Sequence, residues 1–542
     1  MTGTIPACLG NISSLVYLEL AENHLHGSVP SELGMVSHVT VINLYQNHLR
    51  GQIPSSLSNC TNLQVLDLSF NQLTGHIPAE LCSKNTQLLE LYLNDNQLSG
   101  SIPASLFNCT NLQLLDLGIN QLSGVVPMEV GKLTQLHRLY LNNNQLVSGV
   151  VPILTVLINC SALKDIYLDV NHLTGRLPSS IGHLSTNMHQ LSLGGNGFSG
   201  EIPPQIGNLT NLTYLELSNN FFTGSIPSSL NMLQKLERLY MGDNNLQGNI
   251  PMEMGYLKSL GLLSLGTNNF SKRIPDSLAC LQQLRYLNLS NNQLSGNIPP
   301  NLGKLVNLLD LDLSYNKLSG DIPQEVGGLA NLALYFNLSN NLLHGPIPLE
   351  LSKLTMIQVI DISANQLSGY IPSGLGSCKE LEYLNLSCNA LEGPIPMSLG
   401  ELLSLQDVDF SSNNLSGGIP MSLVNLKMLN QFNFSFNNFS REVPKGGVLK
   451  KLGVKAFMVN PSLYGPWVSL PPCFTHKHKR VLHLKRVVIP LVAVAVTLVS
   501  CCFGNLMEME LQETYCYRGW GILKSGAPKN FLWTTYHCNK GV

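Results

Sequence analysis

Apolar and polar residues alternate along this 542-residue chain in one phrase that returns about every 24 residues. In the copy LQVLDLSFNQLTGHIP, at 63–78, Leu66 and Leu68 point to one side of a short strand and Asp67 points to the other. Each copy ends in Ile, Val or Leu followed by Pro; this pair recurs nineteen times between residues 5 and 444, and thirteen of the eighteen gaps are 24 residues long. A unit this short cannot bury its own leucines, so the copies are expected to stack and share one core.

A repeat of about 20–29 residues with the pattern LxxLxLxxN is the signature of leucine-rich repeats. The predicted fold is an α/β solenoid, a right-handed leucine-rich-repeat superhelix of about 18 repeats over residues 1–445. Loops and helices need more room than strands, so the parallel β-sheet is expected on the concave face. At a strand spacing of about 4.8 Å, eighteen strands would span roughly 85 Å, a surface suited to a long or large partner.

Two polar columns are interpreted as structural. An Asp recurs in one strand slot, which favours a ladder over paired catalytic acids. An Asn precedes the proline by seven residues, with one inserted residue after Asn144, and its amide can satisfy backbone groups of stacked turns. This Asn ladder comprises Asn23, Asn47, Asn71, Asn96, Asn120, Asn144, Asn171, Asn196, Asn220, Asn244, Asn268, Asn292, Asn316, Asn341, Asn365, Asn389, Asn413 and Asn437.

Composition narrows the classes of function. Only 12% of residues are charged and the formal net charge is −2, so the composition gives no sign of a basic surface for binding nucleic acid. No CxxC or Cys/His spacing suggests a metal, and no cofactor is expected. Cys60, Cys109 and Cys160 recur in the phrase NC[TS], which favours buried free thiols over bridges.

The LxGxIP ending of the repeats resembles the plant-specific class found in receptor-like kinases, receptor-like proteins and polygalacturonase-inhibiting proteins. The phrases VPKGGV, NPSLYGP and LPPC, between 443 and 473, resemble the C-terminal cap of the receptor-kinase group that includes rice immune receptors. That cap carries two cysteines; here Tyr464 occupies the first position and only Cys473 matches. Residues 446–486 are therefore interpreted as a degenerate cap followed by a basic juxtamembrane stretch.

The segment 487–503 (VVIPLVAVAVTLVSCCF) has no charge and is predicted to be a single transmembrane helix, as the resemblance also implies. The alternative is a buried apolar terminus. The resemblance places the repeats outside the plasma membrane, whereas the basic residues before the segment favour the opposite topology. The chain opens inside a repeat, without a signal peptide or N-terminal cap, which we interpret as a truncated product or incomplete gene model. The tail 504–542 is short and shows no periodicity.

Thirteen N-x-[ST] sequons are candidate glycosylation sites and are typical of a secreted domain, although the repeat phrases alone could generate them. They are Asn11, Asn59, Asn108, Asn159, Asn208, Asn211, Asn269, Asn288, Asn337, Asn385, Asn414, Asn433 and Asn438.

Departures from the repeat consensus on the concave strands point to a binding surface. From Asn288 to Asn433 the strand slot four before the ladder Asn is always Asn or Asp, whereas between Tyr92 and Ser264 it varies. Aromatic residues beside charges of both signs favour recognition, with ordinary surface drift as the alternative. The candidate ligand-binding residues are Glu90, Tyr92, Arg138, Tyr140, Asp165, Tyr167, Asp169, Gln190, Tyr214, Glu216, Arg238 and Tyr240.

These observations favour a non-catalytic, membrane-anchored recognition receptor in defence or developmental signalling. Its partner would be a peptide or protein on the concave face, and the resemblance implies a co-receptor kinase. No glycine-rich loop, VAIK, HRD or DFG element occurs, and no GxSxG elbow. Two alternatives remain: a soluble-type inhibitor of a pathogen cell-wall-degrading enzyme, and a receptor serine/threonine kinase of which this chain is a part.

Overall fold

The computed structural model describes residues 1–465, of which Met1–Leu463 form one compact unit. The predicted transmembrane helix at 487–503, the tail at 504–542 and Cys473 lie outside the described residues, as does most of the basic stretch. Within residues 1–465 no helix is both long enough and apolar enough to cross a bilayer.

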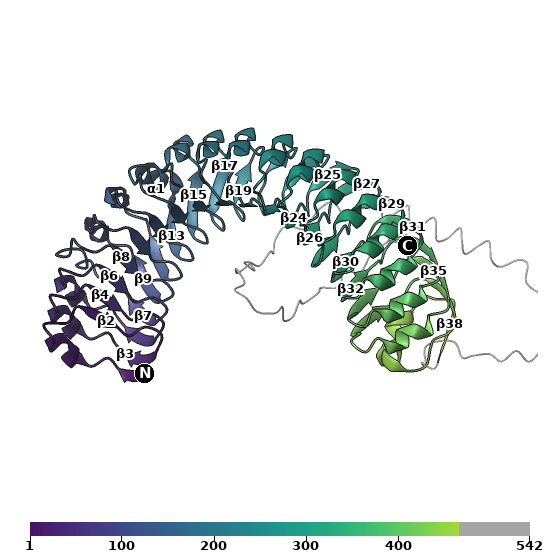
Figure 1. Ribbon diagram of the computed structural model, residues 1–542, viewed down its shortest axis with the longest axis horizontal. Helices are drawn as coiled ribbons and strands as arrows, with labels where there is room; N and C mark the ends of the chain where they lie inside the picture. Colours follow the sequence, from purple (N-terminus) through teal and green to yellow (C-terminus); the bar gives the residue numbers. More distant parts are fainter. Residues whose placement is uncertain (466–542) are drawn as a thin grey trace, which may run out of the picture. The chain divides into compact units, whose positions relative to one another are not determined.

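Eighteen three-residue strands form one parallel sheet along the inner side of the stacked coils, as the repeat predicts (Figure 1). Neighbouring strands pair without a slip, so that Leu115 faces Leu139 and Leu139 faces Ile166. The strands are β2 (Tyr17–Glu19), β4 (Val41–Asn43), β6 (Val65–Asp67), β8 (Glu90–Tyr92), β10 (Leu114–Asp116), β12 (Arg138–Tyr140), β14 (Asp165–Tyr167), β16 (Gln190–Ser192), β18 (Tyr214–Glu216), β20 (Arg238–Tyr240), β22 (Leu262–Ser264), β24 (Tyr286–Asn288), β26 (Asp310–Asp312), β28 (Tyr335–Asn337), β30 (Val359–Asp361), β32 (Tyr383–Asn385), β34 (Asp407–Asp409) and β36 (Gln431–Asn433).

The core lies between this sheet and the outer side of the coils. Leu66, Leu68 and Leu73 of one coil are all fully buried, and their equivalents repeat along the whole unit. Each coil therefore contributes a layer of leucines that only its neighbours can cover, which confirms the shared core expected from the repeat.

A second set of parallel strands lies between the ladder Asn and the Ile-Pro pair of each coil, and the sequence did not predict it. It forms two ten-stranded sheets. The first contains β1 (Thr2–Thr4), β3 (His24–Gly27), β5 (His48–Gly51), β7 (Gln72–Gly75), β9 (Gln97–Ser101), β11 (Gln121–Gly124), β13 (Gln145–Gly149), β15 (His172–Arg176), β17 (Gly197–Glu201) and β19 (Phe221–Thr223). The second contains β21 (Gln247–Gly248), β23 (Asn269–Lys272), β25 (Gln293–Gly296), β27 (Lys317–Asp321), β29 (Leu342–Pro346), β31 (Gln366–Tyr370), β33 (Ala390–Gly393), β35 (Asn414–Gly417), β37 (Asn438–Glu442) and β38 (Ser462–Tyr464).

The outer side consists of 3-10 helices, because the five residues after each proline have room for little more than one turn. The one α-helix among residues 1–465, α1 (Val150–Leu157), lies in a coil lengthened by insertion. The 3-10 helices are η1 (Ala7–Asn11), η2 (Ser31–Met35), η3 (Ser55–Asn59), η4 (Ala104–Asn108), η5 (Met128–Lys132), η6 (Ser179–His183), η7 (Pro204–Asn208), η8 (Ser228–Met232), η9 (Met252–Tyr256), η10 (Asp276–Cys280), η11 (Pro300–Lys304), η12 (Gln324–Gly328), η13 (Leu349–Lys353), η14 (Ser373–Ser377), η15 (Met397–Glu401), η16 (Met421–Asn425), η17 (Gly447–Lys451) and η18 (Val454–Phe457).

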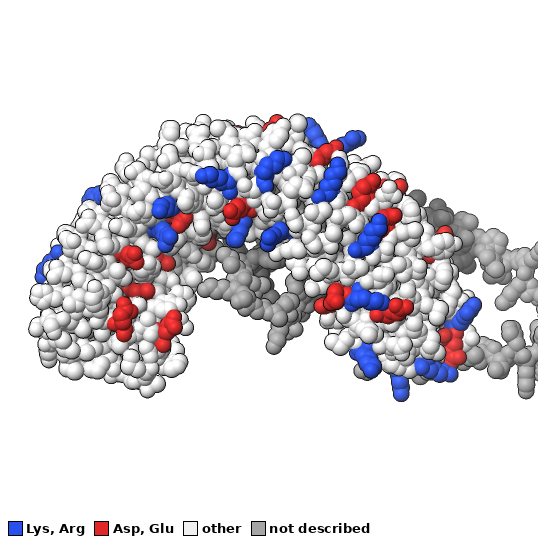
Figure 2. Space-filling model, in the orientation of Figure 1, with Lys and Arg blue, Asp and Glu red and all other residues white. Residues whose placement is uncertain are grey.

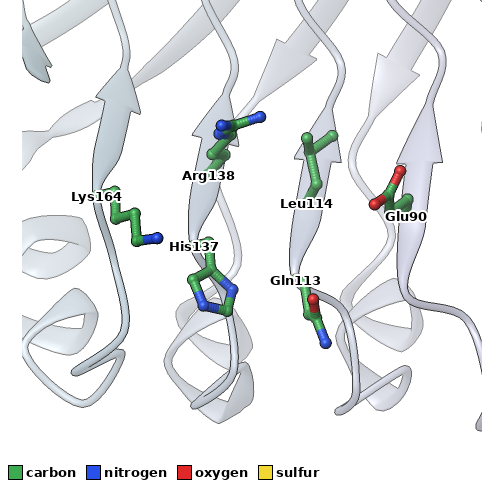
Figure 3. Close-up of a pocket in the computed structure, with 6 residues that line it drawn as sticks. All are labelled: Glu90, Gln113, Leu114, His137, Arg138 and Lys164. Carbon is green, nitrogen blue, oxygen red and sulfur yellow. The ribbon is translucent and has the colours of Figure 1, made fainter.

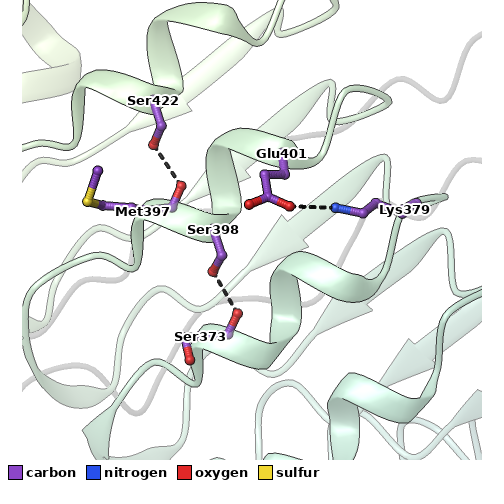
Figure 4. Close-up of polar contacts among 6 residues, drawn as sticks. All are labelled: Ser373, Lys379, Met397, Ser398, Glu401 and Ser422. Atoms are coloured by element: carbon purple, nitrogen blue, oxygen red, sulfur yellow. Dashed lines mark hydrogen bonds and ion pairs between the residues drawn. The ribbon is translucent and has the colours of Figure 1, made fainter.

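Polar contacts join successive helices on the outer side (Figure 4). Ser398 Oγ donates a hydrogen bond to the carbonyl oxygen of Ser373 at 2.6 Å, and Ser422 Oγ donates to that of Met397 at 2.7 Å. Lys379 and Glu401 form an exposed ion pair at 3.0 Å. The serine at the second helix position thus satisfies a carbonyl of the preceding coil, a role that the sequence analysis missed.

Each ladder Asn after Asn23 joins its own turn to the turn of the preceding coil. Asn292 Nδ2 donates to the carbonyl oxygens of Leu265, Leu289 and Ser290 at 3.0, 3.2 and 3.0 Å, and its Oδ1 accepts the backbone N–H of Phe270 at 2.9 Å. Asn460, in the NPSLYGP phrase, makes the same contacts with the last coil and was missed as a ladder member. These bonds therefore give hydrogen-bond partners to buried backbone N–H and C=O groups of the turns and link each coil to the next.

One prediction about the cysteines is wrong. Cys109 forms a disulfide with Cys82, with 5.3 Å between their Cα atoms, whereas Cys60 and Cys160 are buried free thiols as expected. The NC[TS] phrase places Cys109 like the other two. What differs is the preceding coil, whose Cys82 falls one layer below Cys109, within bonding reach.

Removing this disulfide is expected to lower the stability of the N-terminal coils. A bridge that closes 27 residues contributes about 3 kcal/mol in the chain-entropy account. A variant combining Cys82→Ser and Cys109→Ser should unfold at lower urea concentration than the wild type, while Cys8→Ser, at an exposed thiol, should leave the midpoint unchanged. Alkylation of both thiols in the unreduced native protein would contradict the bridge.

Candidate functional site

The structure brings most of the predicted ligand-binding residues together on neighbouring strands. In the first strand position, Arg138, Asp165, Gln190, Tyr214 and Arg238 occur on consecutive strands β12 to β20. In the third position, the same strands carry Tyr140, Tyr167, Ser192, Glu216 and Tyr240. First and third positions of a strand lie on one face, so the ten residues share the concave surface.

Four aromatic rings form a continuous row on this surface, which we call the tyrosine row: Tyr140, Tyr167, Tyr214 and Tyr240. The ring centroids of Tyr140 and Tyr167 are 5.2 Å apart in an edge-to-face arrangement, those of Tyr167 and Tyr214 are 6.1 Å apart and stacked, and those of Tyr214 and Tyr240 are 5.8 Å apart. All four side chains are partly buried. Rings in mutual contact hold one another in place and present a ready-made apolar platform.

Polar contacts fix the hydroxyl ends of the row. Tyr167 donates a hydrogen bond from its hydroxyl to Gln190 Oε1, and the Tyr140 hydroxyl lies 3.5 Å from Asp165 Oδ2. Asp165 also pairs with Arg138, at 3.3 Å from Nε. Burial, with Asp165 and Asp169 nearby, raises the pKa of Tyr167 to about 12, so its hydroxyl stays neutral and donates at any physiological pH.

Two of the predicted acids have local partners or are largely enclosed. Glu216 accepts the backbone N–H of Ser218 at 2.7 Å and also the Ser218 hydroxyl, and burial raises the pKa of its carboxyl to about 7. Burial likewise raises the pKa of Asp169. Glu216 thus occupies the turn-capping role that Asp67 fills with Ser69 in an earlier coil.

Glu90 and Tyr92 lie apart from the other predicted residues. The Tyr92 hydroxyl donates to Glu90 Oε2 at 2.9 Å, and strand β10 separates this pair from Arg138 and Tyr140. The structure therefore places them at the edge of the candidate surface rather than in the tyrosine row.

A shallow pocket opens beside the row, at the amino ends of the strands (Figure 3). It has a volume of about 260 Å³ and is lined by Glu90, Gln113, Leu114, His137, Arg138 and Lys164. The sequence alone does not predict Gln113, Leu114, His137 and Lys164 as site residues. Gln113, His137 and Lys164 each immediately precede a strand, and the alternation of apolar and polar residues does not decide which face of the sheet such a residue lies on. The recurrence of polar residues at this position is the signal in the sequence that could have identified them.

Charge differs along the chain. Residues 1–100 contain seven acidic and two basic side chains, and the N-terminal coils at the left of Figure 2 show acidic side chains on the visible face. Basic side chains become frequent over the central coils, which include Arg138 and Arg238. In residues 1–465 no group of three His, Cys, Asp or Glu side chains is arranged to hold a metal ion.

The C-terminal concave strands hold a second set of varied residues that the sequence analysis missed. The third strand position is monotonous there, but the first position carries Tyr286, Asp310, Tyr335, Tyr383 and Asp407. Burial and the neighbouring Asp312 raise the pKa of Asp310 to about 7. The prediction for the later repeats depends on the slot four before the ladder Asn, which is Asn or Asp throughout, and that slot does not reveal the varied first position.

The sequons fall into two structural groups. Asn288, Asn337, Asn385 and Asn433 lie on concave strands β24, β28, β32 and β36, whereas no sequon lies on strands β2 to β22. Outside the strands of the concave sheet, Asn211 is partly buried and eight sequon side chains are exposed: Asn11, Asn59, Asn108, Asn159, Asn208, Asn269, Asn414 and Asn438. The tyrosine row thus lies on a part of the sheet that no predicted glycan would occupy.

We expect occupancy to follow this division when the chain is expressed in a secretory pathway. Asn337 is only 6% exposed and its Oδ1 accepts the backbone N–H of Ser339 at 2.9 Å, so a glycan there would disrupt the turn. Mass spectrometry after enzymatic deglycosylation in heavy-oxygen water should detect the exposed group and leave Asn337 unmodified. Stoichiometric modification of Asn337 in folded material would contradict this burial.

Family models match the repeats over much of the described chain. One described as "Leucine-rich repeat region" matches residues 268–445, one described as "Leucine Rich repeats (2 copies)" matches 210–253, and one described as "Leucine Rich Repeat" matches 38–60, 62–83, 87–109 and 187–209. Together with the parallel concave sheet, these matches define a leucine-rich-repeat protein.

Several relatives and similar solved structures are plant receptors. The receptor kinase-like protein Xa21 of Oryza sativa subsp. japonica is 45% identical over 58 residues, which are 11% of this chain and 6% of the relative. The ectodomain of the Arabidopsis thaliana membrane receptor kinase GASSHO1/SCHENGEN3, solved with CASPARIAN STRIP INTEGRITY FACTOR 2, is 35% identical with a TM-score of 0.72 and covers 87% of this chain and 61% of its own. The Arabidopsis receptor kinase HAESA, solved with the peptide hormone IDA and the co-receptor SERK1, is 33% identical with a TM-score of 0.67 and covers 87% and 86%.

The chain belongs to the leucine-rich-repeat family of plant receptor-like ectodomains, as the resemblance predicted. Its matches to the curated relatives span only 5–6% of their length.

Proposed function

We propose that this chain is the recognition part of a membrane-anchored plant receptor, and that it binds an extended peptide or a protein segment along the tyrosine row. The observation that carries the proposal is the unbroken contact of four tyrosines, which lie on four of the five adjacent strands β12 to β20, with Arg138 and Arg238 on the same face. Aromatic and Arg side chains are the residue types most often responsible for binding energy at protein interfaces.

Binding on this surface requires no chemistry and little rearrangement. The backbone is a parallel sheet with long-range pairing, and the rings are held by one another and by Gln190 and Asp165. An ordered surface loses little side-chain freedom when a ligand arrives, which favours affinity. The Arg138 side chain is 52% exposed and its Nε lies 3.3 Å from Asp165 Oδ2, so the guanidinium is accessible to a ligand.

The relatives support the wider assignment. GASSHO1 was solved with CASPARIAN STRIP INTEGRITY FACTOR 2 and HAESA with the peptide hormone IDA, and the HAESA complex contains the co-receptor SERK1. This similarity supports a peptide ligand and a co-receptor kinase as the partners of this chain. We further propose, from the apolar sequence of 487–503, that this segment anchors the chain in the plasma membrane with the repeats outside. We also propose a role in defence or developmental signalling, which the same similarity supports.

A selection experiment tests the proposal without knowledge of the natural ligand. The purified full chain is immobilised and used to select binders from a random linear peptide library. We expect peptides that compete with one another and whose binding depends on Tyr140 and Tyr167. A library that yields only binders indifferent to both tyrosines, or none, would overturn the proposed surface.

A further inference from the structure

The shallow pocket beside the tyrosine row has a cationic wall, an apolar floor and an acidic far side. Arg138 and Lys164 supply the charge of one wall and His137 lies beside them, Leu114 forms the floor with 6% of its surface exposed, and Glu90 lies opposite (Figure 3). The side chains come from four consecutive coils, so the pocket is as long as several residues of an extended peptide.

The backbone under the cationic wall is held rigidly. The backbone N–H of Lys164 donates to the carbonyl oxygen of His137 at 2.8 Å, and that of His137 donates to the carbonyl oxygen of Gln113 at 2.8 Å. The slot before each strand is thus part of the sheet's hydrogen-bonded ladder. Side chains anchored this way keep their spacing when a ligand binds.

Positive charge in the wall is only partly compensated. Arg138 meets Asp165 through Nε, at 3.3 Å. Within residues 1–465, the Lys164 ammonium has no carboxylate within ion-pair distance and the His137 ring has no hydrogen-bond partner. Glu90 Oε2, in contrast, accepts the hydroxyl hydrogen of Tyr92 at 2.9 Å. The donors available to a ligand are an ammonium, a guanidinium and the Gln113 amide, a set that suits a carboxylate.

We propose that this pocket binds a carboxylate of the peptide ligand, with its methylene groups over Leu114, and so fixes the register of the peptide on the tyrosine row. The inference rests on the proposed function and adds the charge and position of one ligand group. Glu90 and the acidic N-terminal coils would repel a carboxylate placed one strand closer to the N-terminus of the chain. The pocket therefore also sets the direction in which the peptide runs.

The test uses the same random linear library on three forms of the full chain: wild type, Lys164→Glu and Lys304→Glu. Lys304 is an exposed residue at the end of η11, on the outer side, and supplies the same change of charge. We expect wild type and Lys304→Glu to select Asp, Glu or the free C-terminus at one fixed distance from an aromatic residue. Lys164→Glu should lose that preference and favour Lys or Arg at the same position.

Synthetic versions of a selected peptide separate the sources of the carboxylate. Replacing its Asp or Glu by the amide should weaken binding to wild type about tenfold if the side chain enters the pocket, and amidating the C-terminus should do so if the terminus enters. A second variant, Lys164→Gln, guards against a folding defect of the charge reversal. Two outcomes would overturn this inference alone: tyrosine-dependent peptides without a preferred acidic position, or peptides selected by Lys164→Glu that keep the acidic position selected by wild type. Failure to select any tyrosine-dependent peptide would overturn the proposed function as well.

Discussion

Replacing Asn292 with alanine is expected to destabilise the repeats around it by about 3 kcal/mol, because each buried polar group left without a partner costs about 1–3 kcal/mol. The change removes the three hydrogen bonds donated to the carbonyl oxygens of Leu265, Leu289 and Ser290, and the one accepted from the N–H of Phe270. Asn292 is 9% exposed, so water would replace these bonds poorly. Urea unfolding and hydrogen exchange at the Phe270 amide measure the effect.

Gln293→Ala is the matched control. Gln293 is the next residue, carries the same amide group and is exposed at the start of β25. Its removal should change the free energy of unfolding by less than about 0.5 kcal/mol. Equal, small effects of the two substitutions would contradict the interpretation of the Asn column as a set of joints between coils.

Truncating two tyrosines together is expected to weaken binding of a selected peptide by about tenfold to a hundredfold. Tyr140→Ala with Tyr167→Ala removes two adjacent rings of the row, whose centroids are 5.2 Å apart, and leaves Tyr214 without its stacking partner Tyr167. Losses of about 1.4–2.8 kcal/mol correspond to that range and are usual for aromatic residues at the centre of an interface. Surface plasmon resonance with the full chain gives the affinities.

Two further variants control for this result. Tyr256→Ala removes a half-exposed ring from η9, on the outer side of the coils, and should leave the affinity unchanged. Tyr167→Phe keeps the ring and removes only the hydroxyl that donates to Gln190, so the loss should stay within about threefold. An effect of Tyr256→Ala as large as that of the double substitution would argue against the tyrosine row as the binding surface.

The fold could be predicted from the sequence because the same pattern of apolar and polar residues recurs in every repeat. The alternation around Leu66 and Leu68 predicts a strand with one buried face, and the 24-residue period predicts stacking; the structure confirms both. The second set of strands was missed because a segment such as Gln72–Gly75 contains a single buried leucine. Alternation needs more residues than that to be recognised, and pairing there depends on the neighbouring coil rather than on the segment itself.

The candidate site was only partly predictable, for a related reason. Comparison of the repeats at one strand slot finds Tyr140, Tyr167 and Tyr240. Tyr214 lies two residues earlier in its strand, and ring contacts join it to Tyr167 and Tyr240. The comparison missed His137 and Lys164, because whether a residue just before a strand faces the surface depends on how the chain enters the sheet. It also missed the bond from Cys109, because the partner, Cys82, lies outside the repeated phrase.

The most direct test of the proposed recognition surface is a crystal structure of the chain with a selected peptide. We expect an extended peptide across strands β12 to β20, with an apolar side chain on the rings of Tyr140 and Tyr167. Arg138 or Arg238 should lie within hydrogen-bond distance of the peptide. A peptide bound to the outer helices, or to the concave strands after β24 with the tyrosine row uncovered, would contradict it.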